Sequence, residues 1–332
     1  MEAFSSPSPG AAKVRLPMRV TVTATARLHF GFLDPSGRGK RPFGSFGLSL
    51  DRPGTRLSLQ RAESPRVTGP EHWRAEGYLK TIAASCGMKA AHALTLSEIV
   101  PSHAGLGSGT QLALAVGSAF STLEGLDLSL HEIARRLQRG ARSGIGIFTF
   151  EQGGAVLDSG PRPDGELPAL VSRLPFPAAW RVLLIFDAAA KGLAGASEAA
   201  AFSSLPDFPE AETRELSRRL TDIALPALGA CDFDGFCEQI GYLQRVMGAY
   251  FAPLQGGPYS SAAVSEVLAW LARMGLTGIG QSSWGPTGFA FVPSEADGAA
   301  LLREACARAS HAGLSFELAQ GRNEGAVIET TV

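Results

Sequence analysis

Residues 101–111 read Pro-Ser-His-Ala-Gly-Leu-Gly-Ser-Gly-Thr-Gln, and this stretch carries three glycines within five positions, Gly105, Gly107 and Gly109. It stands between a strand-like segment, HALTLSEIV at 92–100, and an apolar pattern that predicts a helix at about 110–123. Glycines let the backbone approach an anion, and the positive end of the following helix adds to the hydroxyl groups of Ser108 and Thr110 as donors. The stretch therefore predicts a phosphate-binding turn or, alternatively, a tight strand-to-helix connection. It is not a Walker A loop, because that spacing and its lysine are absent.

The composition excludes several classes of protein. The chain has 332 residues, with 30 Lys+Arg against 31 Asp+Glu, so no strong charge draws it to nucleic acid or to a membrane surface. With 45% hydrophobic and 18% charged residues it can bury a large core. The four cysteines show neither a zinc pattern nor a disulfide framework, which favours a reducing cytoplasm. No stretch reaches the roughly 18 apolar residues of a membrane span, and we expect neither export nor insertion.

The pattern along the chain predicts a frayed arm and two domains. Residues 1–17 are rich in Ser, Pro and Gly and have no periodicity. A first domain at 18–180 opens with strands around 19–26 and 57–59, followed by helices near 71–85, 110–123 and 129–139. A second domain at 181–332 opens with the buried strand RVLLIFDAAA. Helices at 210–228, 232–250 and 260–274, strands at 277–281 and 288–292, a helix at 294–309 and a strand at 314–319 suit a ferredoxin-like sandwich with added helices. The fold class is α+β.

Two glycine-rich motifs together resemble one superfamily. The stretch 101–111 resembles the P-x-x-x-G-L-G-S-S-A phosphate loop of the galactokinase, homoserine kinase, mevalonate kinase and phosphomevalonate kinase (GHMP) superfamily, with Gly109-Thr110 in place of Ser-Ala. GIGQSSWGPTG at 278–288 resembles the C-terminal glycine-rich loop of those kinases. RSGIG at 142–146 resembles their S-G-I-D element, but Gly146 stands where the kinases carry the catalytic aspartate. A kinase would therefore need another carboxylate, such as Glu151 or Asp187, to activate its alcohol.

Longer motifs resemble one non-kinase branch, the β-ribofuranosylaminobenzene 5′-phosphate synthases. They are ARLHFGFLD (26–34), PSHAGLGSGTQ, RSGIGIFTFEQGG (142–154), GQSSWGPTGFAF (280–291) and GRNEGA (321–326). The resemblance implies a GHMP-kinase-like two-domain fold that condenses 5-phosphoribosyl 1-diphosphate with 4-aminobenzoate or 4-hydroxybenzoate. Pyrophosphate and carbon dioxide are released, in tetrahydromethanopterin biosynthesis. It further implies Mg²⁺ or another divalent ion, no redox or pyridoxal cofactor, and a cytoplasmic homodimer.

The resemblance also implies a set of site residues. The donor phosphates are expected at Gly105, Leu106, Gly107, Ser108, Gly109, Thr110 and Gln111, with Arg142, Ser143, Gly144, Gln281, Ser282 and Ser283 lining the same cleft. Arg142 is otherwise a surface charge. Trp284 either stacks on the aromatic acid or fills the domain interface. Arg322 and Asn323 either reach the cleft or form a capped turn.

Four further residues are candidates for catalysis and two for metal binding. Alternation places Arg27 and His29 on one face of the first strand, where they grip an anion or serve a structural role. His103 is a general acid, a phosphate donor or a plain loop histidine. Lys191 is a cation near a phosphate or a solvated lysine. Asp187 and Glu198 are candidate magnesium ligands. Two other functions stay open, an ATP-dependent small-molecule kinase of the same superfamily and a catalytically inactive ligand-binding homologue.

Overall fold

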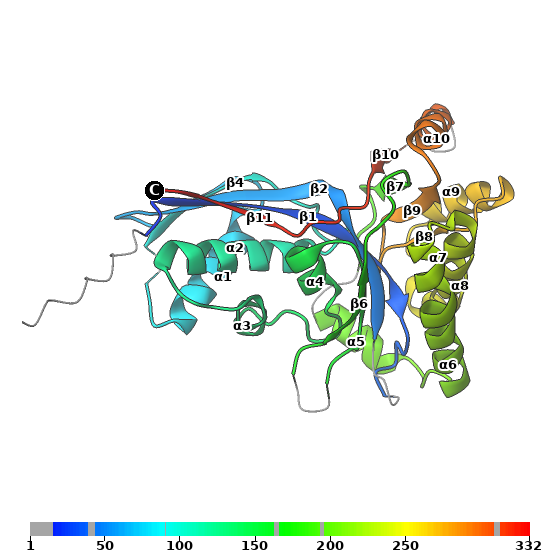
Figure 1. The fold of residues 1–332 in the computed structure, drawn as a ribbon, viewed down its shortest axis with the longest axis horizontal. Helices are drawn as coiled ribbons and strands as arrows, with labels where there is room; N and C mark the ends of the chain where they lie inside the picture. The colour runs from blue at the N-terminus through cyan, green and yellow to red at the C-terminus, as the bar shows by residue number, and fades with distance from the viewer. Residues whose placement is uncertain (1–15, 39–43, 90, 163–165, 193–195, 309–312) are drawn as a thin grey trace, which may run out of the picture.

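A computed structural model describes residues 16–38, 44–89, 91–162, 166–192, 196–308 and 313–332. The chain forms two lobes that meet along β1 (Figure 1). Most of the predicted arm, residues 1–15, lies outside the described residues.

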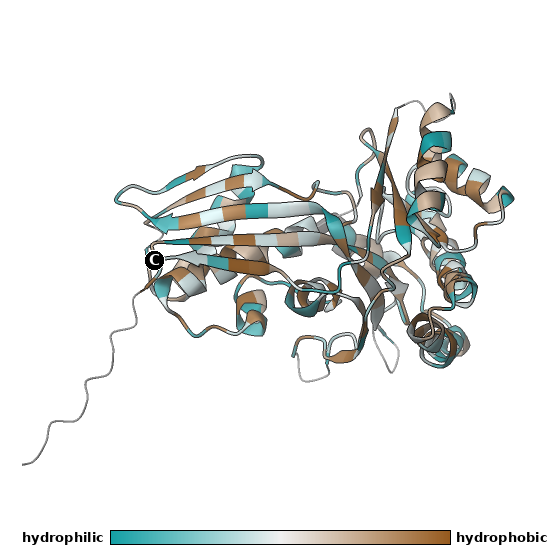
Figure 2. Cartoon of the chain, turned by 45° about the horizontal axis from the view of Figure 1, so that its top comes forward, coloured by the Kyte–Doolittle hydropathy of each residue, from teal (hydrophilic) through white to brown (hydrophobic). Residues whose placement is uncertain are grey.

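A large mixed sheet forms the first lobe. Its path is β11-β1-β2-β4-β3, with β5 pairing β2 and β6. The strands are β1 (Arg19–Phe32), β2 (Ser45–Arg61), β3 (Arg66–Thr68), β4 (His92–Glu98), β5 (Ala155–Asp158), β6 (Leu170–Leu174) and β11 (Val327–Thr331). In β1 the side chains of Val20, Val22 and Ala24 are buried while the threonines between them are half-buried, as the period of two predicts. Figure 2 shows the same change of hydropathy along the strands of this sheet.

Four helices cover one face of the large sheet (Figure 1). They are α1 (His72–Ser85), α2 (Ser108–Glu124), α3 (Leu130–Arg136) and α4 (Ile145–Gln152). Helix α2 is buried along nearly its whole length against β1 and β2. Helix α4 was not predicted, because its buried residues, Ile145 to Phe150, surround the whole helix and leave no amphipathic pattern to read.

The second lobe is built on an antiparallel sheet in the order β10-β7-β9-β8. Its strands are β7 (Arg181–Asp187), β8 (Ile279–Gln281), β9 (Gly288–Val292) and β10 (Leu314–Ala319). Its helices are α5 (Ala196–Ser204), α6 (Glu210–Arg219), the π-helical turn η1 (Leu220–Ala224), α7 (Leu225–Gly229), α8 (Phe233–Gln255), α9 (Ala262–Arg273) and α10 (Glu295–Ala307). Helices α9 and α10 pack on one face of the sheet and α8 on the other. This strand order and the two helices on one face confirm the ferredoxin-like sandwich with added helices.

The core continues from one lobe into the other. One apolar cluster joins Leu28 and Phe30 of β1 to Phe236 of α8 and to Phe289 and Phe291 of β9. The rings of Phe30 and Phe289 lie 5.5 Å apart. The lobes are therefore packed against each other, and a site between them has fixed walls.

The chain end departs from the predicted domain boundary. Residues 181–319 form the second lobe, but β11 returns and pairs antiparallel with β1, from Arg19↔Thr331 to Thr23↔Val327. The second domain therefore ends before residue 327. The sequence pattern of β11 did not show this, because all five of its residues are exposed and no buried face marks it as a strand.

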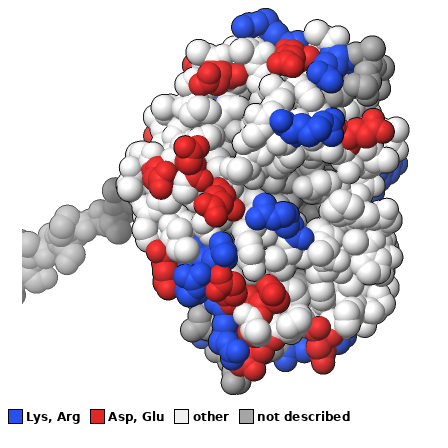
Figure 3. All heavy atoms as spheres, turned by 90° about the vertical axis from the view of Figure 1, so that its right-hand side faces the viewer, with Lys and Arg blue, Asp and Glu red and all other residues white. Residues whose placement is uncertain are grey.

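The surface carries both signs of charge, as the nearly equal numbers of basic and acidic residues predict. Acidic and basic side chains lie close together on the face shown in Figure 3, and neither sign dominates it. Among the described residues no helix combines the length and the apolar character that crossing a bilayer requires. All four cysteines are free thiols.

Candidate active site

The phosphate loop, residues 101–111, lies where the two lobes meet and is held by β1 and by the C-terminal glycine loop, residues 278–288. The Arg27 amide donates to Leu106 O at 3.1 Å, and Ser282 Oγ donates to Gly105 O at 2.8 Å. A methyl group on Gly105 would lie 2.2 Å from Ser282 O, so only glycine allows this approach, and its φ of +76° also favours glycine. The two glycine-rich motifs, which are far apart in sequence, thus form one unit.

Ser282 and Ser283 connect this unit to β1. Ser282 Oγ accepts from the His29 amide at 3.0 Å, and the Ser283 amide donates to His29 O at 3.0 Å. Gln281 is occupied by Ser260, whose amide and hydroxyl both donate to its Oε1. Gln281, Ser282 and the backbone of Ser283 therefore hold the loops together. Gln281 and Ser283 also line a cavity, together with His29 and Trp284.

Arg27 lies directly against the phosphate loop. Its Nη1 donates to Gly105 O at 2.6 Å, and a methyl group on Gly107 would lie 3.1 Å from its Cγ. Burial, opposed by the nearby carboxylate of Glu198, lowers the Arg27 pKa to about 10. Arg27 therefore stays cationic at neutral pH and positions the loop.

His29 is enclosed. Its side chain is 3% exposed, and neither ring nitrogen has a partner among the described residues. Burial, with the Arg27 charge adding to it, lowers its pKa to about 3. The ring also packs on Phe32 at 4.6 Å between ring centres, and His29 lines a cavity with Gln281 and Trp284.

Arg142 and Glu198 form an ion pair, at 3.2 Å between Nη1 and Oε2, and the guanidinium lies 4.7 Å from the centre of the Phe202 ring. Asp187 instead accepts from Ser261 Oγ at 2.7 Å and from the Ala189 amide at 2.9 Å. The two candidate metal ligands thus have separate partners. Among the described residues there is no group of three or more His, Cys, Asp or Glu that could hold a metal ion. Magnesium commonly takes one or two carboxylates and completes its shell with water and substrate phosphates.

Ser143 and Gly144 are held by a residue that the sequence did not single out, Asp158 at the end of β5. Its buried carboxylate accepts from the Gly144 amide at 2.7 Å, from Ser45 Oγ at 2.6 Å and from Ser143 Oγ at 3.2 Å. Burial raises the Asp158 pKa although these donors oppose the rise. No motif surrounds Asp158, so only the tertiary contacts identify it.

A cavity of about 500 Å³ opens beside the first residues of the phosphate loop. His103 and Lys191 lie in its wall. The wall also has charged side chains and apolar ones: Glu71, Asp187 and Glu317, and Phe186, Pro53, Pro101 and Pro286. The loop is fixed here too, since the Gly192 amide donates to His103 O at 2.8 Å. His103 and Glu71 both have positive φ, 56° and 47°, an uncommon conformation that concentrates at functional sites.

Trp284, Arg322 and Asn323 serve packing. Trp284 is 5% exposed and packs against Phe202 and Phe251, with ring centres at 5.3 and 4.6 Å. It also lines a cavity with His29 and Gln281. Arg322 donates to Glu324 O and Gly325 O, and Asn323 exchanges two hydrogen bonds with the backbone of Phe176. They form the capped turn by which the chain returns to the first lobe.

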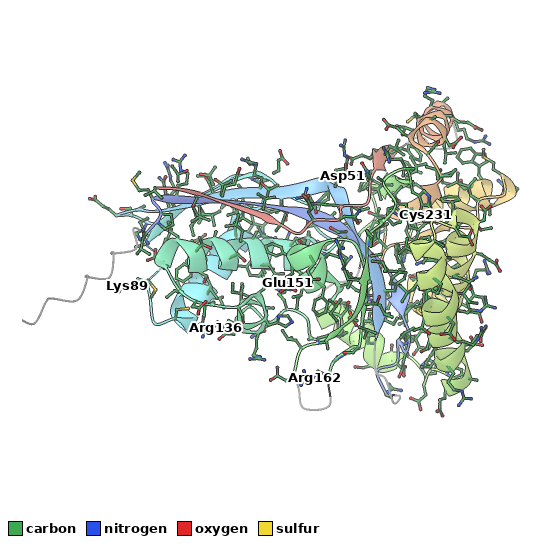
Figure 4. The ribbon with its side chains drawn as sticks, in the orientation of Figure 1. Asp51, Lys89, Arg136, Glu151, Arg162 and Cys231 are labelled. Atoms are coloured by element: carbon green, nitrogen blue, oxygen red, sulfur yellow. The ribbon has the colours of Figure 1, made fainter. Side chains whose placement is uncertain are left out.

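Gly146 and Gln111 connect α4 to α2. Gln111 Nε2 donates to Gly146 O at 2.9 Å, and a methyl group on Gly146 would lie 2.9 Å from Thr110 Cγ2. Glu151 is exposed and lies at the other end of α4 (Figure 4). It lines a separate cavity with Ser118 and Ala326. It therefore does not replace a carboxylate at position 146.

Comparison with known proteins agrees with this architecture. The model of the GHMP kinase N-terminal domain matches residues 74–154, and that of the GHMP kinase C-terminal domain matches residues 224–311. Homoserine kinase from Cytophaga hutchinsonii superposes with a TM-score of 0.65 at 16% identity, over 97% of this chain and 100% of that one. Mevalonate diphosphate decarboxylase from Staphylococcus aureus gives 0.65 at 13% identity, over 94% and 98%. Fold and loops together define a protein of the GHMP kinase superfamily.

The curated relatives specify the branch. The β-ribofuranosylphenol 5′-phosphate synthase of Archaeoglobus fulgidus is 32% identical over 82% of this chain and 88% of its own length. The enzyme of the same name from Methanothermobacter thermautotrophicus is 26% identical over 81% and 87%. The chain belongs to this synthase family and is an enzyme of the pentosyltransferase class.

Proposed function

We propose that the enzyme condenses 5-phosphoribosyl 1-diphosphate with 4-hydroxybenzoate or 4-aminobenzoate, releasing pyrophosphate and carbon dioxide, as a step in tetrahydromethanopterin biosynthesis. The names of the two synthases specify a phenol product, which makes 4-hydroxybenzoate the first acceptor to test. The bond from ribose C1 to the diphosphate oxygen breaks, and its electron pair leaves with pyrophosphate. The ring carbon that bears the carboxylate bonds to C1. That carboxylate leaves as carbon dioxide, and its electron pair restores the aromatic ring.

One observation carries the proposal. The loop that resembles the kinases' phosphate loop is present, but Gly146 lies beside it at the position where the kinases carry a carboxylate. Thr110 fills the space that a side chain at this position would occupy. A site with phosphate donors and no carboxylate there suits a reaction in which a diphosphate departs and no alcohol has to be deprotonated. The kinase alternative needs a base that Glu151, on a separate cavity, does not supply.

The cavity beside His103 supports a place for the aromatic acid. Its volume of about 500 Å³ is typical of small-molecule sites. Phe186 and the prolines offer apolar contact to a ring, and Lys191 offers a cation to the carboxylate. Lys191 and His103 are therefore proposed to orient the acid, a role that the buried ring of His29 does not share.

A divalent ion, a homodimer and a cytoplasmic location are further parts of the proposal and rest on the resemblance. The ion would enter with the diphosphate and neutralise part of its charge. Dependence of turnover on magnesium, and the mass of the particle in solution, check the first two.

The test is an assay with magnesium, phosphoribosyl diphosphate and carboxyl-labelled 4-hydroxybenzoate or 4-aminobenzoate, scored by labelled carbon dioxide. A parallel arm offers ATP with a panel of alcohols. Donor-dependent release of carbon dioxide without ATP consumption supports the proposal. ATP consumption alone would return the chain to the kinases, and binding without turnover in either arm would favour the inactive homologue.

A further inference from the structure

Two arginines from separate helical segments converge on the first turn of α2. A methyl group on Gly109 would lie 3.6 Å from Arg139 Nη1, 3.7 Å from Arg74 Nη2 and 3.9 Å from Tyr78 Oη. Arg74 belongs to the first turn of α1, and Arg139 follows α3. We call Arg74 and Arg139 the arginine pair.

Contacts with neighbouring side chains fix both guanidinium groups. Arg74 Nη2 donates to Ser108 Oγ at 3.3 Å, and its Nη1 forms an ion pair with Glu71. Arg139 Nη2 donates to Tyr78 Oη at 2.9 Å, and its guanidinium carbon lies 5.1 Å from the centre of the Tyr78 ring. The pair is thus oriented before any ligand arrives, which lowers the entropy cost of binding.

The arrangement places positive charge where it is unfavourable without an anion. The N-terminus of a helix carries a partial positive charge, so cations beside it are destabilising. The 17-residue α2 has no acidic residue in its first turn, and Gly107 gives it no side-chain cap. Arg139 has no ion pair among the described residues, and its buried Nε has no hydrogen-bond partner there.

We propose that the arginine pair binds the diphosphate of the donor and keeps hold of pyrophosphate after the bond to ribose C1 breaks. This assignment rests on the proposed function and deepens it. Two guanidinium groups and a helix end match the several oxygens and high negative charge of a diphosphate. Arg27 and Arg142 share the carboxylate of Glu198, and Arg74 pairs with Glu71. Among the described residues Arg139 is thus the arginine at the loop whose charge no ion pair offsets. On this assignment the ribose 5′-phosphate does not contact the arginine pair.

The experiment measures the affinity of the purified enzyme for two probes, inorganic pyrophosphate and ribose 5-phosphate, by calorimetry. The variants are Arg139→Gln and Arg74→Lys, which lie on different segments. The matched control is Arg136→Gln. Arg136 lies at the end of α3 (Figure 4), and its Nη1 donates to Ser85 O at 2.7 Å. Each pair variant is expected to weaken pyrophosphate binding roughly ten- to hundredfold and to leave ribose 5-phosphate binding within a factor of about two. The control should bind both probes as the unsubstituted enzyme does.

The outcomes separate the assignment from the proposed function. Unchanged pyrophosphate affinity in either folded variant overturns the assignment, and so does a loss confined to ribose 5-phosphate. If the unsubstituted enzyme forms product but Arg139→Gln keeps its pyrophosphate affinity, the proposed function stands and the arginine pair is structural. If the unsubstituted enzyme binds neither probe and forms no product, both fail.

Discussion

His29 stands where the two lobes meet, and its ring has no hydrogen-bond partner among the described residues. A protonated imidazole there would be a buried charge beside the cation of Arg27. The folded state therefore excludes the proton, which links the stability of the fold to pH.

This linkage predicts a loss of stability in acid. The unfolded chain binds a proton at His29 below a pKa of 6.5, whereas the folded chain does so only near 3. Between these values the free energy of unfolding falls as pH falls, by up to about 1.4 kcal/mol per pH unit from this group. His29→Phe should therefore flatten the dependence of denaturant midpoint on pH between 6 and 4. The exposed His72→Gln is the control, and an unaltered slope in His29→Phe would contradict the burial argument.

Gly146 and Thr110 fit each other by size. Gly146→Asp should lower the free energy of unfolding by about 1–3 kcal/mol, because its Cβ would lie 2.9 Å from Thr110 Cγ2. The added Thr110→Ala should recover part of that loss. A double-mutant cycle in denaturant measures the coupling. Additive effects would mean that the two residues do not restrict each other.

Asp158 accepts hydrogen bonds from the turn that precedes α4. Asp158→Asn should cost about 2–3 kcal/mol of unfolding free energy, because an amide nitrogen cannot accept from both the Gly144 amide and the Ser45 hydroxyl. Chemical denaturation measures the loss. Asp51→Asn, at a half-exposed carboxylate (Figure 4), is the control. An equal loss of unfolding free energy in both variants would contradict the stabilising role of the Asp158 hydrogen bonds.

At the scale of elements, the phosphate loop works as a unit with the C-terminal glycine loop and the end of β1. Contacts from distant segments, including the Arg27 amide, Ser282 Oγ and the Gly192 amide, fix its backbone. A substitution within it is therefore expected to alter binding before it alters the fold.

Gly107→Leu tests this expectation. Gly107 has a φ of +81°, and a side chain there would meet Arg27, so donor affinity should fall at least tenfold while the enzyme still folds. Gly87→Leu is matched in backbone strain, with φ +70° and open space around it. Calorimetry with phosphoribosyl diphosphate and thermal melting compare the two variants. Equal donor affinity in both would remove Gly107 from the site.

At the scale of the whole molecule, the chain closes on itself. Strand β11 leaves the second lobe and lies along the edge of β1, near the start of the fold (Figure 1). The last residues thus cover a sheet edge that would otherwise be open to pairing with other chains.

Removing residues 327–332 should therefore destabilise the first lobe. The ladder hydrogen bonds from Arg19 to Thr23 would be lost, which costs roughly 2–4 kcal/mol, and the open edge should promote aggregation. Melting and light scattering measure the two effects. The full-length double variant Val327→Thr and Ile328→Thr keeps the strand and serves as control. A truncated chain as stable and monodisperse as this control would contradict the role of β11.

The amino-acid sequence by itself determined the helices with an amphipathic face, the strands with period two, the ferredoxin-like order of the second lobe and the two glycine loops. Each of these leaves a local pattern, because burial on one face repeats along the chain. It also indicated the family, since GLGSGT and GQSSWGPT are glycine-rich motifs whose backbone turns few other sequences can form.

Only the tertiary structure decided which candidates share a site. It placed Arg74, Arg139 and Asp158 at the phosphate loop or its neighbouring turn, turned Trp284, Arg322 and Asn323 into packing residues, and added β11 to the first sheet. Apart from the local turn that Arg322 forms with Glu324 and Gly325, none of these follows from spacing, because the partners lie tens to hundreds of residues apart. Their meeting depends on how the lobes pack, and packing is a property of contacts that no local stretch of sequence contains.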